Sequence, residues 1–452
     1  MRIGIDFGTT NSGAAWFDGK QVHLFPIDPT SANPTVIRSV LYITCDGETF
    51  VGKEAIDQYY AQNIGRATRM ARKWIGEIEV EGGDMYFIRD VYVLVDELLP
   101  GRLLRSLKSG LATTYDGTQI FDRYHTLEAL IAIYLRTVRE RVEKLAGEKV
   151  DHVVLGRPVN FVGEAEYNQQ AQKRLRQAAE MAGYTNIDFE LEPIAAALSY
   201  ELSVTKPQNI VVFDFGGGTL DITVMRVGHK SGRGDEGSRK VYATGGVGIA
   251  GDMFDRRIIE GLMLEHFGRG STVQMGVDRA IAPFPSQYTD ALTNWQTVLD
   301  LNRPETLRFF SNAEITSSQP ARIRALASLV INNYAMHLFD EMERAKIALS
   351  DAFFDLIQVQ GEDIHIWQPI ARGQFEALIA DETQRVETCL LDTLKASGLG
   401  ADDIDAVVRT GGSAQIPRFV EMLGQHFGPQ KVVLADVFNS VTAGLAIRAA
   451  MT

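Results

Sequence analysis

The sequence has few residues of the kinds that build disulfide frameworks, zinc sites or nucleic-acid surfaces. Its 452 residues include two cysteines, Cys45 and Cys389, and eight histidines without ligand-like spacing, which argues against a disulfide framework and a zinc site. Acidic residues outnumber basic ones by 58 to 45, so the chain lacks the cationic surplus typical of proteins that bind phosphate backbones. We therefore expect no nucleic-acid partner.

The sequence also lacks long hydrophobic runs, and its start does not resemble a leader segment. No stretch approaches the ~20 apolar residues that span a bilayer, and Met1 leads directly into a predicted strand without the regions of a signal peptide. The chain is 45% hydrophobic, which is enough for large cores, and its length corresponds to about three domain-sized units or two large ones. We expect a cytoplasmic protein without a membrane partner.

Two short glycine-rich passages are the most informative feature that is present. IDFGTT at 5–10 and VFDFGGGTLD at 212–221 each follow an apolar run and precede alternating residues, which predicts a strand-turn-strand hairpin. In a Walker loop or a dinucleotide-binding fingerprint the glycines would open a helix instead. Two such passages indicate a nucleotide clamp that is split across two halves of the protein.

The residue types in both passages suit a phosphate and its metal. Glycine permits turns that point several backbone N–H groups at one anion, and carboxylates can hold a hydrated Mg²⁺. For either passage alone, the alternative is a tight turn whose aspartate makes a local hydrogen bond. The predicted loops are Gly8, Thr9, Thr10 and Asn11, and Gly216, Gly217, Gly218 and Thr219; the predicted metal-binding acids are Asp6 and Asp214.

The rest of the chain has an α/β pattern. Helical periodicity predicts helices at 127–145, 163–182, 322–349 and 374–396, with strands at 153–155, 220–227 and 406–409. The chain opens with a meander of hairpins, and the second half repeats a similar order, which suggests a duplicated α/β domain. Residues 75–107 fit no clear pattern.

Five stretches in order carry a family resemblance: IGIDFGTTNS at 3–12, EPIAAALSY at 192–200, VVFDFGGGTLDITV at 211–224, ERAKIALS at 343–350 and RTGGSAQIP at 409–417. They resemble the nucleotide-binding domain of the seventy-kilodalton heat-shock chaperones, within the actin, sugar-kinase and chaperone fold. The short length, LGRPVNF at 155–161 and SVTAGLA at 440–446 are most similar to the YegD branch, whose bacterial members end after the ATPase domain.

The resemblance implies a fold and a set of ligands. The fold is a duplicated actin-like α/β ATPase with two lobes around a nucleotide cleft, at 1–205 and 206–452, with a smaller subdomain at about 256–345. The ligands are ATP or ADP and Mg²⁺. The linker and peptide clamp of full-length chaperones are expected to be absent, which would exclude peptide capture by the usual route.

The resemblance also implies residue roles. Asp6 and Asp214 hold the metal through water, and Glu192 is a second acid near the metal and the attacking water; a helix N-terminal acid is the simpler alternative for Glu192. A catalytic lysine is expected, with Lys108 as the candidate, Arg105 as the second choice and a plain surface lysine as the alternative. The phosphate contacts are Thr9, Thr10, Gly217, Gly218 and Thr219, and the nucleoside and neighbouring contacts are Gly251, Glu343, Lys346, Ser350, Gly411, Gly412 and Ser413.

Several positions depart from the family pattern. Ile347 replaces the arginine that stacks on adenine, so a cation–π attraction of about 0.5–2 kcal/mol is lost. Ala250 replaces a glycine before Gly251, and Phe438 replaces an acid near the last helix. For Glu343 and Lys346, without the surrounding motif, a solvated helix face with i,i+3 charge pairing would be the simpler interpretation.

We expect a protein that binds MgATP and slowly hydrolyses it to ADP and phosphate, with closure of the lobes as the output and a protein client or co-chaperone as partner. The first alternative is a non-catalytic, nucleotide-dependent binding module. A small-molecule kinase of the same fold and an actin-like filament rank lower, because the 343–350 and 409–417 stretches are of the chaperone type.

Overall fold

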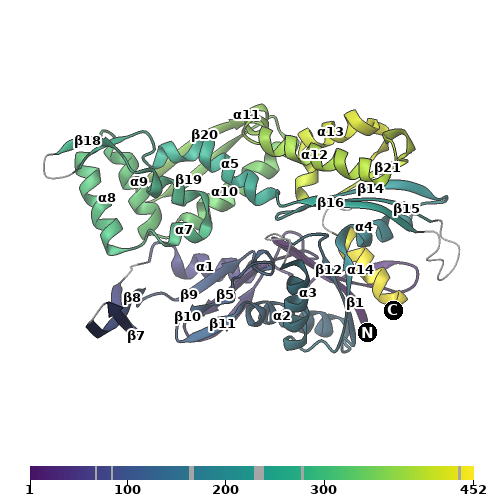
Figure 1. The fold of residues 1–452 in the computed structure, drawn as a ribbon, viewed down its shortest axis with the longest axis horizontal. Coiled ribbons are helices and arrows are strands. Elements are labelled where there is room, and N and C mark those ends of the chain that lie inside the picture. Colours follow the sequence, from purple (N-terminus) through teal and green to yellow (C-terminus); the bar gives the residue numbers. More distant parts are fainter. Residues whose placement is uncertain (67–68, 83–84, 162–166, 229–238, 276–278, 436–438) are drawn as a thin grey trace. The chain divides into compact units, whose positions relative to one another are not determined.

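The computed structural model describes residues 1–66, 69–82, 85–161, 167–228, 239–275, 279–435 and 439–452. The chain divides into two compact units (Figure 1). The first comprises residues 1–58, 102–254 and 376–452, and the second comprises residues 59–101 and 255–375. The α/β class is confirmed, because both units combine helices with sheets.

The first large sheet of the first unit opens with the predicted meander. Its strand order is β13-β12-β1-β2-β3, and β4 (Ile37–Arg38) also pairs with β2. The N-terminal strand β1 is antiparallel to β2 but parallel to β12, which is parallel to β13. Parallel strands require long crossovers, which here contain α2 (Leu127–Ala146) and α3 (Asn168–Met181). The strands are β1 (Arg2–Phe7), β2 (Asn11–Phe17), β3 (Val22–Leu24), β12 (His152–Arg157) and β13 (Asn186–Leu191).

The second large sheet of the same unit has the same layout. Its order is β16-β15-β14-β21-β22, where β14 is antiparallel to β15 and parallel to β21. Helices α11 (Arg372–Leu378), α12 (Ala380–Ser397) and α13 (Pro417–Phe427) belong to this half of the chain, and α12 packs on β15 and β16. The strands are β14 (Gln208–Phe215), β15 (Leu220–Val227), β16 (Lys240–Val247), β21 (Ala406–Thr410) and β22 (Val432–Leu434).

Two helices, α4 (Glu192–Glu201) and α14 (Ser440–Met451), pack against each other and against both the β1 and the β14 side of the unit (Figure 1). Their close approach depends on glycine, because a Cβ atom at Gly444 would lie 1.6 Å from the Ala195 carbonyl oxygen. A Cβ atom at Gly4 in β1 would lie 2.2 Å from the Ala446 nitrogen. This packing fixes the start of α4, where Glu192 lies.

Smaller elements complete the first unit. One sheet has the order β6-β5-β9, and β10 pairs with β11. A short 3-10 turn, η1 (Leu107–Gly110), follows β9 directly. The bounds are β5 (Val40–Thr44), β6 (Thr49–Val51), β9 (Gly101–Arg105), β10 (Gly117–Ile120) and β11 (Arg123–Thr126).

The second unit combines three two-stranded ribbons with short helices. The part of the chain without a sequence-based assignment, 75–107, forms most of a long hairpin of β7 (Met70–Gly82) and β8 (Met85–Asp96). The other pairs are β17 (Thr272–Met275) with β18 (Ala280–Pro283) and β19 (Phe354–Gly361) with β20 (Ile364–Ala371). The helices are α6 (Ser286–Asp290), α7 (Trp295–Leu299), α8 (Pro304–Thr316), α9 (Pro320–Ile331) and α10 (Ala335–Asp351); α1 (Lys53–Asn63) and α5 (Gly251–Ile258) run from one unit into the other.

Two predicted helices are wrong in their extent. The predicted helix at 322–349 is two helices, α9 and α10, because Asn333 adopts a left-handed backbone conformation with φ 59°. The Asn333 side chain also donates to the Asn63 carbonyl oxygen. The predicted helix at 374–396 is likewise split, and α11 and α12 meet at Ile379. Of the predicted helix at 163–182, residues 163–166 lie outside the described residues, and α3 covers most of the remainder.

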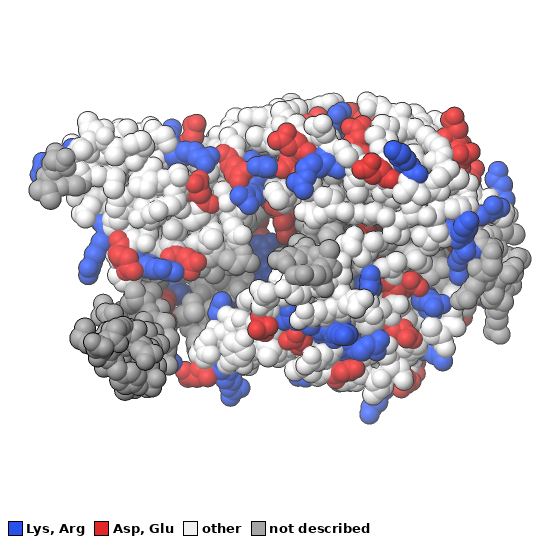
Figure 2. Space-filling model, in the orientation of Figure 1, with Lys and Arg blue, Asp and Glu red and all other residues white. Residues whose placement is uncertain are grey.

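The charged side chains are mixed on the molecular surface. On the face drawn in Figure 2, Lys and Arg side chains are interspersed with Asp and Glu side chains. Within the described ranges, no helix has the length and apolar character needed to cross a membrane.

Candidate functional site

The turns of the two glycine-rich hairpins touch each other in the first unit. A Cβ atom at Gly217 would lie 2.5 Å from the Thr10 Cγ2 atom, and one at Gly218 would lie 2.6 Å from the Thr9 Oγ1 atom. Within the first turn, a Cβ atom at Gly8 would lie 2.2 Å from the Asn11 carbonyl oxygen. Side chains at these glycines would therefore push the two turns apart.

Three buried carboxylates, the partly exposed carboxylate of Asp6 and one buried ammonium group lie beside these turns. Asp6 and Asp214 are each the next-to-last residue of their strands, β1 and β14, while Glu192 begins α4. The exposed fractions are 9% for Asp214, 7% for Glu192 and 7% for Lys108. The Lys108 Nζ atom lies 2.5 Å from the Glu192 Oε1 atom. The structure thus places Lys108, the candidate chosen over Arg105, in contact with Glu192 at a sequence separation of 84 residues.

Sequence reasoning gave no role to the fourth carboxylate, Asp221. It lies on β15 directly opposite Asp214, and its side chain is 2% exposed. It accepts hydrogen bonds from the Val159 N–H at 2.9 Å and from the Thr219 hydroxyl at 3.0 Å. The signal was in the sequence, because residues 214 and 221 are equidistant from the centre of the 216–219 turn and must therefore pair across a tight hairpin.

The titration behaviour of these groups reflects an excess of buried negative charge. Burial, and then the charge of Glu192, raise the pKa of Asp6 to about 7, although Lys108 opposes the shift. Burial and Glu192 likewise raise the pKa of Asp221 to about 7. The pKa of Asp214 is raised well above its usual range by burial and by the charges of Glu192, Asp221 and Asp6. Burial lowers the pKa of Lys108, but the surrounding carboxylates outweigh it and raise that pKa overall.

This donor set fits a hydrated magnesium ion. Several buried carboxylates with a single ammonium group leave negative charge that a divalent cation would neutralise. Within the residues that the structure describes, no three His, Cys, Asp or Glu side chains are arranged as direct ligands of one ion. Mg²⁺ keeps several of its waters and is bound through one or two carboxylates, a requirement that Asp6 and Asp214 can meet.

The third glycine pair lies against the second turn. Gly411 has φ 84°, and a Cβ atom there would lie 2.3 Å from the Phe215 carbonyl oxygen. After Gly412, the Ser413 hydroxyl donates to the Gly216 carbonyl oxygen at 2.7 Å. The Gly251 N–H also approaches this oxygen, at 3.4 Å. The structure therefore brings Gly251 and 411–413 together with the 216–219 turn.

The predicted adenosine contacts Glu343, Lys346 and Ser350 all lie on α10 of the second unit. Within that unit the Lys346 ammonium pairs with the Asp255 carboxylate at 2.9 Å. Ile347, on the same helix, is 60% exposed. Of the other positions that depart from the family pattern, Ala250 is buried directly before Gly251, and Phe438 lies outside the described residues.

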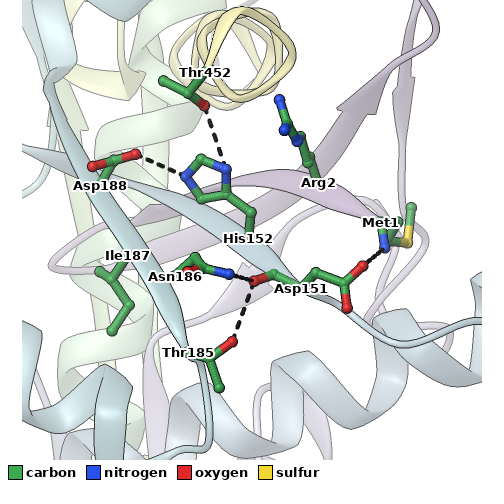
Figure 3. Close-up of a pocket in the computed structure, with 9 residues that line it drawn as sticks. All are labelled: Met1, Arg2, Asp151, His152, Thr185, Asn186, Ile187, Asp188 and Thr452. Carbon is green, nitrogen blue, oxygen red and sulfur yellow. Dashed lines mark hydrogen bonds and ion pairs between the residues drawn. The ribbon is translucent and has the colours of Figure 1, made fainter.

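A pocket of about 780 Å³ lies at the opposite ends of the first-sheet strands (Figure 3). Arg2, His152 and Asn186 pair across β1, β12 and β13 at their N-terminal ends, whereas Asp6 lies near the C-terminal end of β1. In the pocket, His152 lies between the Asp188 carboxylate and the Thr452 hydroxyl (Figure 3). The pocket is separate from the candidate site, because the two lie at opposite ends of these strands. Ligands of open α/β sheets bind outside the carboxyl ends of parallel strands, which is the end where the candidate site lies.

Comparison with known proteins identifies the family of the chain. The family model described as "Hsp70 protein" matches residues 2–283 and 330–452. Similar curated proteins include "Chaperone protein DnaK" of Thermotoga petrophila and of Thermotoga maritima, each 25% identical over an alignment of 460 positions that covers 99% of this chain and 59% of the relative. The chain thus spans about three fifths of the length of the curated relatives it matches. Because the family model covers most of the sequence, the chain belongs to the Hsp70 family.

Proposed function

We propose that the protein binds MgATP at the two glycine turns and slowly hydrolyses it to ADP and phosphate. The observation that carries this proposal is the contact between the two turns beside the Lys108–Glu192 pair at 2.5 Å. Membership of the Hsp70 family supports it independently. The output would be closure of the predicted lobes at 1–205 and 206–452, and the curated relatives named as chaperone proteins support a protein client or co-chaperone as partner.

In this proposal the phosphates lie against the backbone N–H groups of the two turns, and the chemistry depends on position and charge. A bound Mg²⁺, held by Asp6 and Asp214 through water, would neutralise charge on the phosphate oxygens. The Lys108 ammonium would stabilise the charge that develops on the transferred phosphoryl group, and Glu192 would orient the attacking water. No nucleophilic side chain is required.

The hydrogen bond of Thr219 to Asp221 supports a phosphate contact at Thr219. Its hydroxyl donates to the Asp221 carboxylate at 3.0 Å, so its oxygen lone pairs and the 216–219 backbone remain for other partners. Asp221 also holds the Val159 N–H, which joins the second turn to the segment after β12. We propose that Asp221 orders the second turn and takes no part in metal binding.

The nucleoside would be bound by Glu343, Lys346 and Ser350 of α10 and by the 411–413 turn. Ile347 gives adenine an apolar contact in place of a guanidinium group, which favours weaker binding of the base than in relatives that carry the arginine. This residue also favours the second candidate function, a binding module that changes shape with ATP and does not turn it over.

The test is phosphate release from purified protein with MgATP. We expect slow turnover that Asp214→Asn lowers and that added acceptor sugars do not accelerate. Bound ATP without any phosphate release would replace the ATPase with the binding module. Phosphate transfer to an added acceptor would indicate a small-molecule kinase instead.

A further inference from the structure

The segment that carries Lys108 has little regular structure of its own. Lys108 lies in η1, a turn of four residues. Ser106, the residue directly before η1, adopts a left-handed backbone conformation with φ 54°. Such a conformation is disfavoured for serine and persists where neighbouring groups hold it. The segment therefore depends on the rest of the unit for its position.

A single arginine of α3 supplies much of that support. Arg174, which is 6% exposed, donates through Nη2 to the Tyr115 carbonyl oxygen at 2.8 Å. Its Nη1 atom faces three further carbonyl oxygens, those of Gly110 at 3.3 Å, Leu111 at 3.4 Å and Thr113 at 3.3 Å. All four acceptors lie within residues 110–115, which begin at the last residue of η1.

The same segment is tied to Lys108 itself. The Leu111 N–H donates to the Lys108 carbonyl oxygen at 3.2 Å, so the residue whose oxygen faces Arg174 also holds the backbone of the lysine. Leu111 and Ala112 are fully buried, which anchors the segment in the core of the unit. A displacement of 110–115 would therefore be transmitted to Lys108.

Glu128 fixes the other side of the guanidinium group. Its carboxylate, on the first turn of α2, accepts a hydrogen bond from the Arg174 Nε atom. Burial would raise the pKa of Glu128, but hydrogen bonds and the charge of Arg174 outweigh burial and lower it, so the pair is ionised at neutral pH. The planar guanidinium group, with five donors in a fixed arrangement, is suited to bridge one carboxylate and several carbonyl oxygens at once.

We infer that Arg174 is a positioning residue that holds the Lys108 segment, and through it the Lys108 ammonium, in place beside Glu192. The inference rests on the proposed function for its kinetic consequence, because Lys108 must act on phosphate for its position to affect turnover. Its structural part, the placement of Lys108, can be measured without nucleotide.

The test compares two arginines of the same helix. Arg176 also donates to a carbonyl oxygen, that of Ile187 at 2.8 Å, and lies over the Phe189 ring at 5.1 Å, but among the described residues it forms no hydrogen bond with 110–115. Arg174→Met and the control Arg176→Met are labelled with an amine-acylating reagent, and the rate at Lys108 is followed by mass spectrometry. We expect Lys108 to be labelled about tenfold faster in Arg174→Met than in the wild type, because a loosened segment exposes its amine. In Arg176→Met we expect the labelling rate of the wild type.

Turnover provides the second readout. Arg174→Met should lower kcat about 10- to 100-fold with little change in KM for MgATP, because a misplaced group loses stabilisation of the transition state. In a Lys108→Met background the same substitution should cause no further loss. Arg174→Lys, which keeps the charge but not the fork of donors, should lie between wild type and Arg174→Met, and it carries the test if Arg174→Met does not fold.

The outcomes separate the two claims. If the wild type releases no phosphate but Lys108 is labelled faster in the Arg174 variants than in the wild type, the proposed function fails and the positioning role stands. If Lys108 labelling and kcat in folded Arg174 variants match the wild type, or if Arg176→Met changes both as much, the positioning role is wrong.

Discussion

The two glycine-rich hairpins share a layout but differ in what stands opposite the first aspartate. In the second hairpin Asp214 pairs across the strands with Asp221, whereas in the first hairpin Asp6 pairs with Gly13. Helix α14 covers that position, because a Cβ atom at Gly13 would lie 2.7 Å from the Thr442 Oγ1 atom. A common fold therefore gives the two hairpins unequal charge.

This inequality has electrostatic consequences. The charged form of Lys108 is stabilised by Glu192, then by Asp6 of the first hairpin and less by Asp221 of the second. The second hairpin has two facing carboxylates, and burial together with the charges of Glu192, Asp221 and Asp6 raises the pKa of Asp214. The second hairpin therefore carries one more carboxylate beside the site than the first.

The largest expected effect comes from the ammonium group. Lys108→Met should lower phosphate release about 10²- to 10³-fold, because one preorganised charge on the transferred group is lost. It also leaves Glu192 buried without its partner, so the free energy of unfolding should fall as well. Rates measured under single-turnover conditions test the first effect, and thermal unfolding tests the second.

Two variants separate turnover from stability. Adding Glu192→Gln to Lys108→Met should recover stability without recovering turnover. Arg105→Met is the matched control on the preceding strand, and a loss of turnover equal to that of Lys108→Met would assign the catalytic role to Arg105.

Substitution of Asp6 and Asp214, the two proposed metal-binding aspartates, distinguishes the hairpins directly. Asp214→Asn should remove about 10- to 100-fold of the Mg²⁺-dependent gain in ATP affinity, while Asp6→Asn should remove less, because Lys108 already compensates part of the charge of Asp6. Titrations with ATP at several Mg²⁺ concentrations measure both. Equal losses in the two variants would mean that the hairpins bind the cation symmetrically.

Substitutions opposite the aspartates should change stability with opposite signs. Gly13→Ala should destabilise the protein by about 1–3 kcal/mol, since its methyl group overlaps the buried Thr442 side chain. Asp221→Asn should stabilise the ligand-free protein by about 0.5–2 kcal/mol at neutral pH, because it removes a buried charge and can still pair with Val159 and Thr219. Urea unfolding measures both values, and a loss of stability in Asp221→Asn would contradict the charge excess.

The smallest expected effect concerns an acid that has its own cation. Because the folded-state pKa of Glu128 lies below its ordinary value of 4.5, its contribution to stability is present above that pH and is lost as the pH falls further. The free energy of unfolding of the wild type should exceed that of Glu128→Gln by about 1 kcal/mol at pH 7. This difference should shrink below pH 4.5. A difference that grows in acid would show that the Glu128 pKa is raised, as it is for the aspartates of the hairpins.

Local sequence patterns were sufficient to predict the hairpins and the location of Asp6 and Asp214 beside their turns. Alternation sets the strands, glycine sets the turns, and an aspartate at a strand end lies beside its turn. The same local rules missed the break between α9 and α10, where two adjacent asparagines, Asn332 and Asn333, favour a left-handed residue more than a continued helix.

Contacts distant in sequence could not be predicted in this way. The hydrogen bonds from Arg174 to 110–115 cross about sixty residues, and neither side has a pattern that names the other. Glu192 could be identified as a site residue by its motif, but its pairing with Lys108 depends on the packing of α4 and on the irregular η1 segment. The predicted lobes and the YegD branch remain predictions.

The most direct test of the account is calorimetric titration of the purified protein with ATP, with and without Mg²⁺, followed by a phosphate assay of the same samples. The account predicts binding that tightens with Mg²⁺ in the wild type, loses most of that tightening in Asp214→Asn, and is followed by slow release of phosphate. ATP binding that is absent, or that is unaffected by Mg²⁺ in both proteins, would contradict it.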